Sequence, residues 1–195
     1  KLVQTARTEL AQALAVRPEE ITFTASGSEA NNLAIIGASQ ATALEGDYTT
    51  VRILTTHIEH PSVSEAVAAM AQRGAQVEYI PVDSAGRIEL TALAAALQTP
   101  APLLTFAYAN SEVGTVQPVR RIVRLVRQVQ PKTLVHLDAA QAPLWLPCGR
   151  NQLGVDMLSL DAGKCNGPKG VGVLIARHGV ALAPIIYGGG QEAGW

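Results

Sequence analysis

Hydrophobic positions along the chain alternate between two patterns. One is the three-to-four-residue spacing of an amphipathic helix, and the other is the short continuous apolar run of a strand buried on both faces. The helical spacing predicts helices over residues 2–14, 33–37, 61–73, 90–97 and 118–129. The apolar runs predict strands over residues 21–25, 51–55, 77–82, 103–108, 134–137, 155–160 and 170–176. This alternation is typical of an α/β fold with a mostly parallel sheet.

The chain contains no internal repeat, low-complexity tract or obvious linker, so we expect one domain over residues 1–195. Its first residue, Lys1, already lies within a helical pattern. Its last residue, Trp195, follows a glycine-rich run closely. Since neither end resembles a natural domain boundary, we expect a domain that is truncated on both sides.

Composition narrows the class of protein. With 48% hydrophobic and 16% charged residues, the 195-residue chain has enough apolar material for a sizeable core and is unlike a disordered protein. A net charge of -1 leaves no basic excess for nucleic acid. No apolar run approaches the roughly 18 residues of a membrane span. The two cysteines, Cys148 and Cys165, are too few for a disulfide framework and favour a reducing compartment such as the cytoplasm.

The junction between the first strand and the next helix carries Ser26, Gly27 and Ser28. Glycine lets backbone amides approach an anion, and a helix start supplies free N–H groups. The three residues could therefore bind a phosphate. A plain helix N-cap formed by either serine is the alternative.

An acidic residue, Asp138, directly follows a buried strand. A carboxylate there is unfavourable unless it meets a cation, and a protonated pyridine nitrogen is such a cation. Keeping that nitrogen charged makes the ring an electron sink. A cap or turn residue is the alternative interpretation.

A lysine, Lys164, follows another strand in a glycine-rich turn. Partial burial there would make its amine nucleophilic, and an imine with an aldehyde cofactor is the natural use. A surface lysine is the alternative. Lys169 is a rival candidate, but Gly-Pro-Lys-Gly is more typical of a turn with an exposed lysine.

Two histidines, His57 and His60, lie between a strand and a helix with Glu59 between them. Their spacing is not the helical spacing of a zinc site and no third ligand is close in the sequence, so we predict no metal. An imidazole could instead stack on a flat cofactor ring, whereas an ordinary loop histidine is the alternative for His57.

The order and spacing of these motifs resemble the cysteine desulfurase family, in the class V aminotransferase group of pyridoxal-phosphate (PLP) enzymes of fold type I. The matching stretches are residues 23–32, 59–63, 109–118, 136–141, 164–172 and 188–192. The resemblance implies a three-layer α/β/α large domain with a mostly parallel mixed sheet. It also implies that a smaller C-terminal domain lies outside this chain.

The resemblance implies a role for each matching residue. Lys164 would hold PLP as an imine, Asp138 would pair with the pyridine nitrogen, and Gln141 would bind the ring hydroxyl. His60 would stack on the ring and move protons, which makes His60 and Lys164 the catalytic candidates. The full set of implied cofactor contacts is Ser26, Gly27, Ser28, His60, Ser111, Asp138, Gln141, Asp161, Gly163 and Lys164.

The implied activity is the release of sulfur from L-cysteine, giving L-alanine and an enzyme persulfide. The persulfide-forming cysteine of the family would lie beyond Trp195, so we expect this stretch alone to be inactive. Cys165 neighbours Lys164, but adjacent strand residues face opposite ways, which makes it a poor nucleophile candidate. The implied partners are a second copy in a homodimer and a sulfur acceptor or iron–sulfur scaffold protein.

Three residues depart from the family pattern. Gly163 stands where the family usually has histidine, Asp161 where it usually has serine or threonine, and Ser111 where it commonly has asparagine. A carboxylate near a phosphate is repulsive unless a cation lies between them. Two alternatives therefore stay open, namely a related class V lyase acting on selenocysteine or cystine, and a non-catalytic family member.

Overall fold

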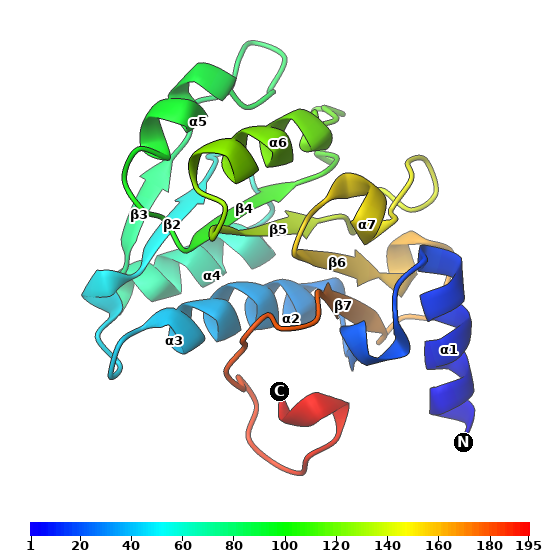
Figure 1. Ribbon diagram of the computed structural model, residues 1–195. Coiled ribbons are helices and arrows are strands. Elements are labelled where there is room, and N and C mark those ends of the chain that lie inside the picture. The colour runs from blue at the N-terminus through cyan, green and yellow to red at the C-terminus, as the bar shows by residue number, and fades with distance from the viewer.

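The computed structural model describes residues 1–192, 194 and 195 in full and residue 193 by its backbone alone. A seven-stranded sheet lies between two layers of helices (Figure 1). The strands are β1 (Ile21–Thr24), β2 (Arg52–Thr55), β3 (Gln76–Tyr79), β4 (Leu103–Ala107), β5 (Leu134–Asp138), β6 (Met157–Asp161) and β7 (Gly172–Ala176). The helices are α1 (Leu2–Leu14), α2 (Gly27–Asn32), α3 (Ala38–Thr42), α4 (Pro61–Gln72), α5 (Leu90–Ala96), α6 (Val119–Val129) and α7 (Arg150–Leu153). The predicted three-layer α/β/α fold is confirmed.

The sheet is mixed but mostly parallel, as predicted. Its strand order is β1-β7-β6-β5-β4-β2-β3, and only β7 runs antiparallel to its neighbours β1 and β6. The strands β2, β3, β4, β5 and β6 pair in parallel. The carboxyl ends of every strand except β7 therefore meet at one edge of the sheet, and β7 begins at that edge.

Each face of the sheet has its own hydrophobic core. On one face, the helical run from α2 to α3 and helix α4 bury side chains such as Ile35, Val67 and Met70. On the other, α5, α6 and α7 together with α1 bury Leu93 and Ile122 among others. Figure 1 shows these two helical layers below and above the strands. Each such side chain stabilises the fold by about 1.5–3 kcal/mol, and burial on both faces explains why the strands appear as continuous apolar runs.

Two local features were not predicted. The run from α2 to α3 is interrupted by a π-helical segment, η2 (Leu33–Gly37), and α7 forms between β5 and β6. A four-residue helix is too short to show periodicity, and one wide turn does not break the helical spacing of apolar residues.

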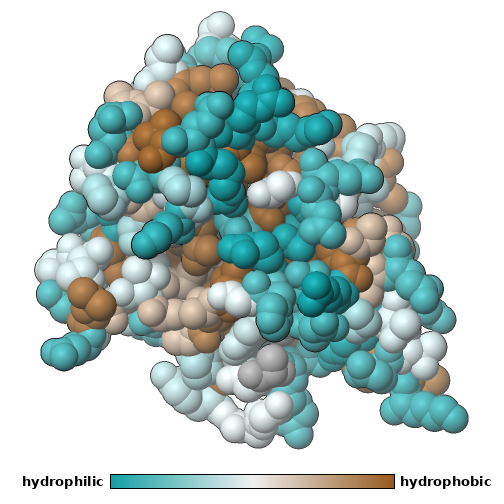
Figure 2. Space-filling model, viewed as in Figure 1, coloured by the Kyte–Doolittle hydropathy of each residue, from teal (hydrophilic) through white to brown (hydrophobic). Residues whose placement is uncertain are grey.

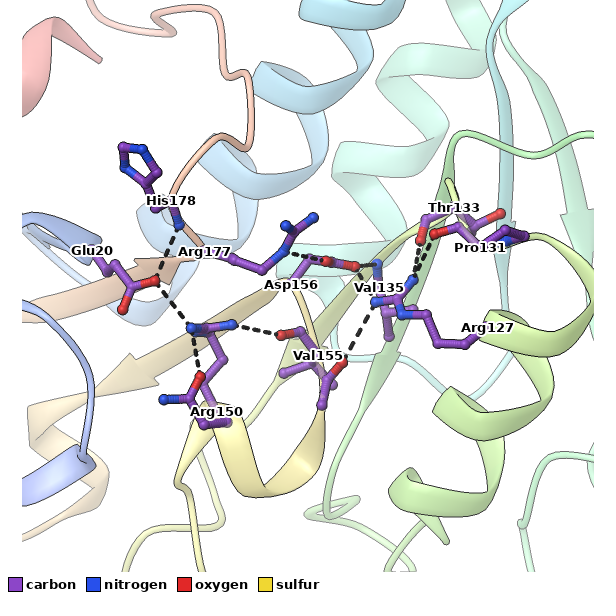
Figure 3. A network of polar contacts seen from close by, with 12 residues as sticks. Glu20, Arg127, Pro131, Thr133, Val135, Arg150, Val155, Asp156, Arg177 and His178 are labelled. Atoms are coloured by element: carbon purple, nitrogen blue, oxygen red, sulfur yellow. Dashed lines mark hydrogen bonds and ion pairs between the residues drawn. The ribbon is translucent and has the colours of Figure 1, made fainter.

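A buried carboxylate, Asp156, ties the loop before β6 to its surroundings (Figure 3). It accepts hydrogen bonds from the Val135 amide at 2.8 Å and from the guanidinium groups of Arg127 at 2.5 Å and Arg177 at 2.9 Å. Arg127 lies in the last turn of α6, so this ion pair ties α6 to the segment before β6.

A second buried carboxylate, Glu20, is paired in the same region (Figure 3). It lies 3.0 Å from Arg150 of α7 and accepts a hydrogen bond from the His178 amide at 3.1 Å. Burial would raise the pKa of Glu20, but hydrogen bonds from the Arg17 and His178 amides and the charge of Arg150 outweigh it and lower the pKa. We call Glu20, Arg127, Arg150, Asp156 and Arg177 the paired-charge network.

The surface seen in Figure 2 carries mostly hydrophilic side chains, with hydrophobic ones in several patches among them. In the part of the chain that the structure describes, no helix combines the length and the apolar character needed to cross a membrane.

Candidate active site

A cavity of about 450 Å³ opens where the strand carboxyl ends meet. Its walls come from the segments that follow β1, β2, β4, β5 and β6, which is where ligands bind in sheets of this kind. The predicted site residues that line it are Gly27, Ser28, His60, Ser111, Asp138, Gln141, Asp161 and Lys164. Ser26 and Gly163, also predicted, lie outside the lining. Residues far apart in the sequence are thus collected at one place, because each follows a strand of the same sheet.

Lys164 lies three residues beyond the end of β6, in a 3-10 turn over Ala162–Lys164. Its side chain is exposed rather than partly buried as expected, because the glycine-rich turn provides few neighbours. Lys164 and Asp138 line the same cavity. Cys165 caps this turn and is not in a strand, so strand alternation does not explain its position. Its Sγ hydrogen-bonds the Asp161 carbonyl at 3.3 Å, and it lies outside the lining.

Asp138 ends β5 with its side chain almost fully buried at 7% exposure. One carboxylate oxygen accepts the Ala140 amide at 3.0 Å and the other accepts the Asn31 side-chain amide at 2.9 Å. No lysine or arginine among the described residues forms an ion pair with it. Burial, the largest influence, raises the pKa of Asp138 despite the opposing hydrogen bonds from Ala140 and Asn31. A cation entering the cavity would restore the charged form.

Asn31 is a site residue that the sequence reasoning did not single out. It is 1% exposed on α2, and its Nδ2 donates to Asp138 and to Ser62, each at 2.9 Å. Its Oδ1 is buried and has no hydrogen-bond partner among the described residues. Asn31 lies 107 positions from Asp138, so only its presence in the family-like stretch 23–32 could have drawn attention to it.

Glu59 is a second residue whose role was not predicted. It lines the cavity next to His60 and accepts hydrogen bonds from the Thr56 hydroxyl and from the Ala107 amide, the latter at 2.7 Å. Burial raises the pKa of Glu59 to about 7, and the nearby charge of Asp138 adds to this shift. Two carboxyl groups, those of Glu59 and Asp138, therefore lie at the cavity wall, and a negative charge on Asp138 makes ionisation of Glu59 less favourable.

His60 is the N-cap residue of α4. Its Nδ1 accepts the Ser62 amide at 3.1 Å and contacts the Ser62 hydroxyl at 2.8 Å, which fixes the orientation of the ring at the cavity wall. His57 instead stacks on Tyr79, with ring centroids 3.9 Å apart. Among the described residues, no cluster of three or more histidine, cysteine, aspartate or glutamate side chains could hold a metal ion.

The turn that was predicted to bind the phosphate is in contact with the carboxylate of Asp161. Ser26 Oγ accepts the Glu29 amide at 3.1 Å, so Ser26 is the helix cap that was the alternative interpretation. The Gly27 amide donates to Asp161 Oδ2 and the Gly163 amide donates to Asp161 Oδ1, both at 2.8 Å. The Asp161 carboxylate therefore occupies backbone donors that were predicted to bind the cofactor phosphate.

Comparison with known proteins places this geometry in a family. The sequence profile of the class V aminotransferases, described as "Aminotransferase class-V", matches residues 1–194. The chain belongs to this family. Among curated relatives of this class V aminotransferase, cysteine desulfurase IscS of Dictyoglomus turgidum is 35% identical over 190 residues, which cover 97% of this chain and 47% of that protein.

Solved structures agree with the profile match. A "NifS-like protein" superposes with a TM-score of 0.92 at 38% identity, covering 98% of this chain and 51% of that one. The structure titled "SspA in complex with cysteine" superposes with a TM-score of 0.89 at 34% identity, covering 98% and 54%. The chain spans about half the length of the relatives it matches. Class V aminotransferases and cysteine desulfurases depend on PLP, which confirms the predicted cofactor for the family.

The cavity of this class V aminotransferase fits the ring end of PLP. Asp138 is a buried carboxylate without an ion pair to lysine or arginine in the described part of the chain, and the exposed amine of Lys164 shares its cavity. A volume of about 450 Å³ is ample for a single pyridine ring. At the phosphate end, the departure at Asp161 has a structural consequence, since this carboxylate holds the Gly27 amide.

Proposed function

We propose that this class V aminotransferase chain is the PLP-binding part of a cysteine desulfurase. In the whole enzyme, the reaction would release sulfur from L-cysteine and give L-alanine and an enzyme-bound persulfide. The observation that carries the proposal is the presence in one cavity of an exposed amine, Lys164, and a buried acid, Asp138, that forms no ion pair with lysine or arginine in the described part of the chain. The names of the relatives support cysteine as the substrate.

Several polar groups of the cavity have a role in this proposal. PLP, when bound, supplies an aldehyde for amines and a ring that withdraws electrons. Lys164 would hold the aldehyde, and Asp138 would keep the ring nitrogen protonated because a buried carboxylate gains most from an adjacent cation. Asn31 would hold Asp138 in place through its amide, 2.9 Å away.

The remaining residues would position the ring and the substrate. His60, with its ring fixed by Ser62, would stack on the cofactor and move a proton at the substrate. Gln141 would donate to the ring hydroxyl, and Ser111 would face the substrate side of the cavity.

A pair of lysine variants tests the proposal. We expect Lys164→Ala to abolish the yellow absorbance of lysine-bound PLP, whereas Lys169→Ala, which removes a nearby exposed lysine, should keep it. Borohydride reduction followed by peptide mass spectrometry should locate the PLP mass on Lys164. A retained absorbance band in the Lys164→Ala protein would refute the assignment.

The proposal extends to partners and location. We propose a homodimer in the cytoplasm that passes sulfur to an acceptor protein or an iron–sulfur scaffold. Sedimentation of the purified protein at several concentrations tests the dimer, because a dimer that dissociates shows a concentration-dependent mass. Radioactive sulfur transfer from cysteine to candidate scaffolds tests the acceptor.

One observation favours a second candidate, a non-catalytic family member, because Asp161 takes up an amide that a phosphate would use. A ligand that binds the native state raises its melting temperature. An unchanged melting temperature in the presence of PLP would favour this second candidate, and a clear rise would favour the desulfurase.

A further inference from the structure

We infer that Asp161 selects against the phosphate of the cofactor, so that this site binds an unphosphorylated pyridoxal or pyridoxamine ring nearly as well as its phosphate ester. The inference rests on the proposed function insofar as the cavity binds a pyridine ring. It concerns a different end of that ring from Lys164 and Asp138, and it can fail independently of them.

The Asp161 carboxylate already satisfies the backbone donors at this end of the cavity. Its two oxygens accept the Gly27 and Gly163 amides, both at 2.8 Å. These bonds link the turn after β1 to the turn after β6, across 134 residues of sequence. A phosphate could bind the Gly27 amide only after the carboxylate has moved away, and the displaced carboxylate would remain next to the phosphate.

The turn is closely fitted to Asp161. A Cβ atom on Gly27 would lie 3.0 Å from the Asp161 Cβ, and a Cβ atom on Gly163 would lie 3.1 Å from Asp161 Oδ1. Gly172 allows the approach, because a Cβ there would lie only 2.2 Å from the Ser26 carbonyl carbon. Gly27 and Gly163 thus leave room for the Asp161 carboxylate, and Gly172 lets β7 approach the turn after β1.

The charged side chains around the cavity also disfavour a bound phosphate. Four carboxyl groups line it, from Glu59, Glu112, Asp138 and Asp161, against one lysine, Lys164. A phosphate ester brings up to two further negative charges into this surrounding, and like charges repel strongly where water is partly excluded. An unphosphorylated ring brings a hydroxyl in place of the phosphate, and a hydroxyl can donate a hydrogen bond to Asp161.

Asp161 and Gly163 both differ from the residues that are usual in the family, and in this structure each affects the space available to the other. The family usually has histidine at the position of Gly163 and serine or threonine at the position of Asp161. Because a Cβ atom at position 163 would lie 3.1 Å from Asp161 Oδ1, a histidine there would require the carboxylate to shift, and a serine at position 161 would leave it more room. We therefore expect the two substitutions to be strongly non-additive in phosphate affinity.

Calorimetric titration with pyridoxamine phosphate and with pyridoxamine tests the inference without any bond to Lys164. We expect Asp161→Ser to tighten pyridoxamine phosphate binding by about tenfold or more, which corresponds to about 1.4 kcal/mol. Pyridoxamine binding should change by about twofold or less, since it carries no phosphate charge. Asp161→Asn should tighten phosphate-ester binding less than serine does, because it removes the charge but keeps the volume.

Two controls sharpen the result. Glu65→Gln removes an exposed charge on α4 outside the cavity lining and should leave both affinities unchanged. Gly163→His should weaken phosphate-ester binding in the natural background and strengthen it in the Asp161→Ser background. Folding of each variant is checked by its far-ultraviolet circular dichroism and melting temperature.

The outcomes separate this inference from the proposed function. Equal tightening of pyridoxamine and its phosphate in Asp161→Ser, or no tightening of either, would overturn the role of Asp161 even if Lys164 still carries PLP. Preferential tightening of the phosphate ester would support it even if the Lys164 experiment failed. Absence of binding of either ring to the natural protein and to Asp161→Ser would overturn both.

Discussion

The two ends of strand β6 carry aspartates in opposite circumstances. Asp156, just before the strand, is held by two guanidinium groups and a backbone amide (Figure 3). Asp161, the last residue of the strand, is held by two backbone amides, and Asp138 at the end of the neighbouring strand β5 is held by one backbone and one side-chain amide. No ion pair joins either of these two to a cation in the part of the chain that the structure describes.

This difference separates a structural region from a site. A buried charge that meets its partner within the chain stabilises the fold, and removing one partner is costly. A buried carboxylate without such a partner is unfavourable in the empty protein and gains when a cationic ligand arrives. The pKa of Glu20 in the paired-charge network is accordingly lowered, whereas the pKa values of Asp138 and Glu59 in the cavity are raised.

The largest effect on stability is expected at Asp156, in the paired-charge network. Asp156→Ala would leave the Val135 amide and the guanidinium groups of Arg127 and Arg177 without their acceptor. We expect the free energy of unfolding to fall by about 3 kcal/mol. Urea denaturation measures this change. Glu19→Ala, which breaks an exposed ion pair with Arg17, is the control and should cost less than about 1 kcal/mol.

A smaller effect on stability is expected when a change of pH alters the protonation of Glu59 in the cavity. The pKa of Glu59 is about 7 in the folded protein, against 4.5 for an ordinary glutamate. The folded protein therefore binds the Glu59 proton more tightly than the unfolded chain does. The stabilisation that this proton binding provides is fully present below pH 4.5 and is lost as the pH rises through 7. We expect a loss of about 2.5 kcal/mol between pH 4.5 and pH 7. Denaturation curves of Glu59→Gln at the same pH values should show a flatter profile, and an equal slope would contradict the assignment.

The smallest change in stability is expected at Asp138. Asp138→Asn removes a buried charge, and the Asn31 amide can flip so that its unpartnered Oδ1 accepts a hydrogen bond from the side-chain amide introduced at position 138. We expect the ligand-free protein to gain about 1 kcal/mol of stability. Binding of PLP should weaken by about tenfold, because the ring nitrogen loses its anion. A loss of stability in the ligand-free variant would show that Asp138 belongs with the paired charges.

The fold was largely predictable because its strands are buried on both faces. Every predicted strand formed within a few residues of its expected bounds, as did the helices with clear apolar spacing, such as α1 and α6. Helix α7 was missed because four residues carry no periodic signal. The position of Lys164 after a strand was also correct, although its expected burial was not, since exposure depends on neighbours that the local sequence does not name.

The site was predictable in part. Eight predicted site residues line the cavity, but the contacts of Asn31 and Glu59 were not predicted although both lie in family-like stretches, because their partners lie 107 and 48 positions away. Ser26 was assigned to the cofactor, whereas its hydroxyl caps α2. Sequence alone does not distinguish a capping serine from a ligand-binding one, because both stand at the start of a helix.

The sequence by itself determined the order of helices and strands and the identity of the residues that follow each strand, because both depend on local periodicity and residue type. The tertiary structure decided which of those residues meet. Strands β1 and β6 both pair with β7, and this arrangement brings the Gly27 amide to the Asp161 carboxylate. Contacts of this kind depend on how the strands are ordered in the sheet, and no local pattern in the chain specifies that order.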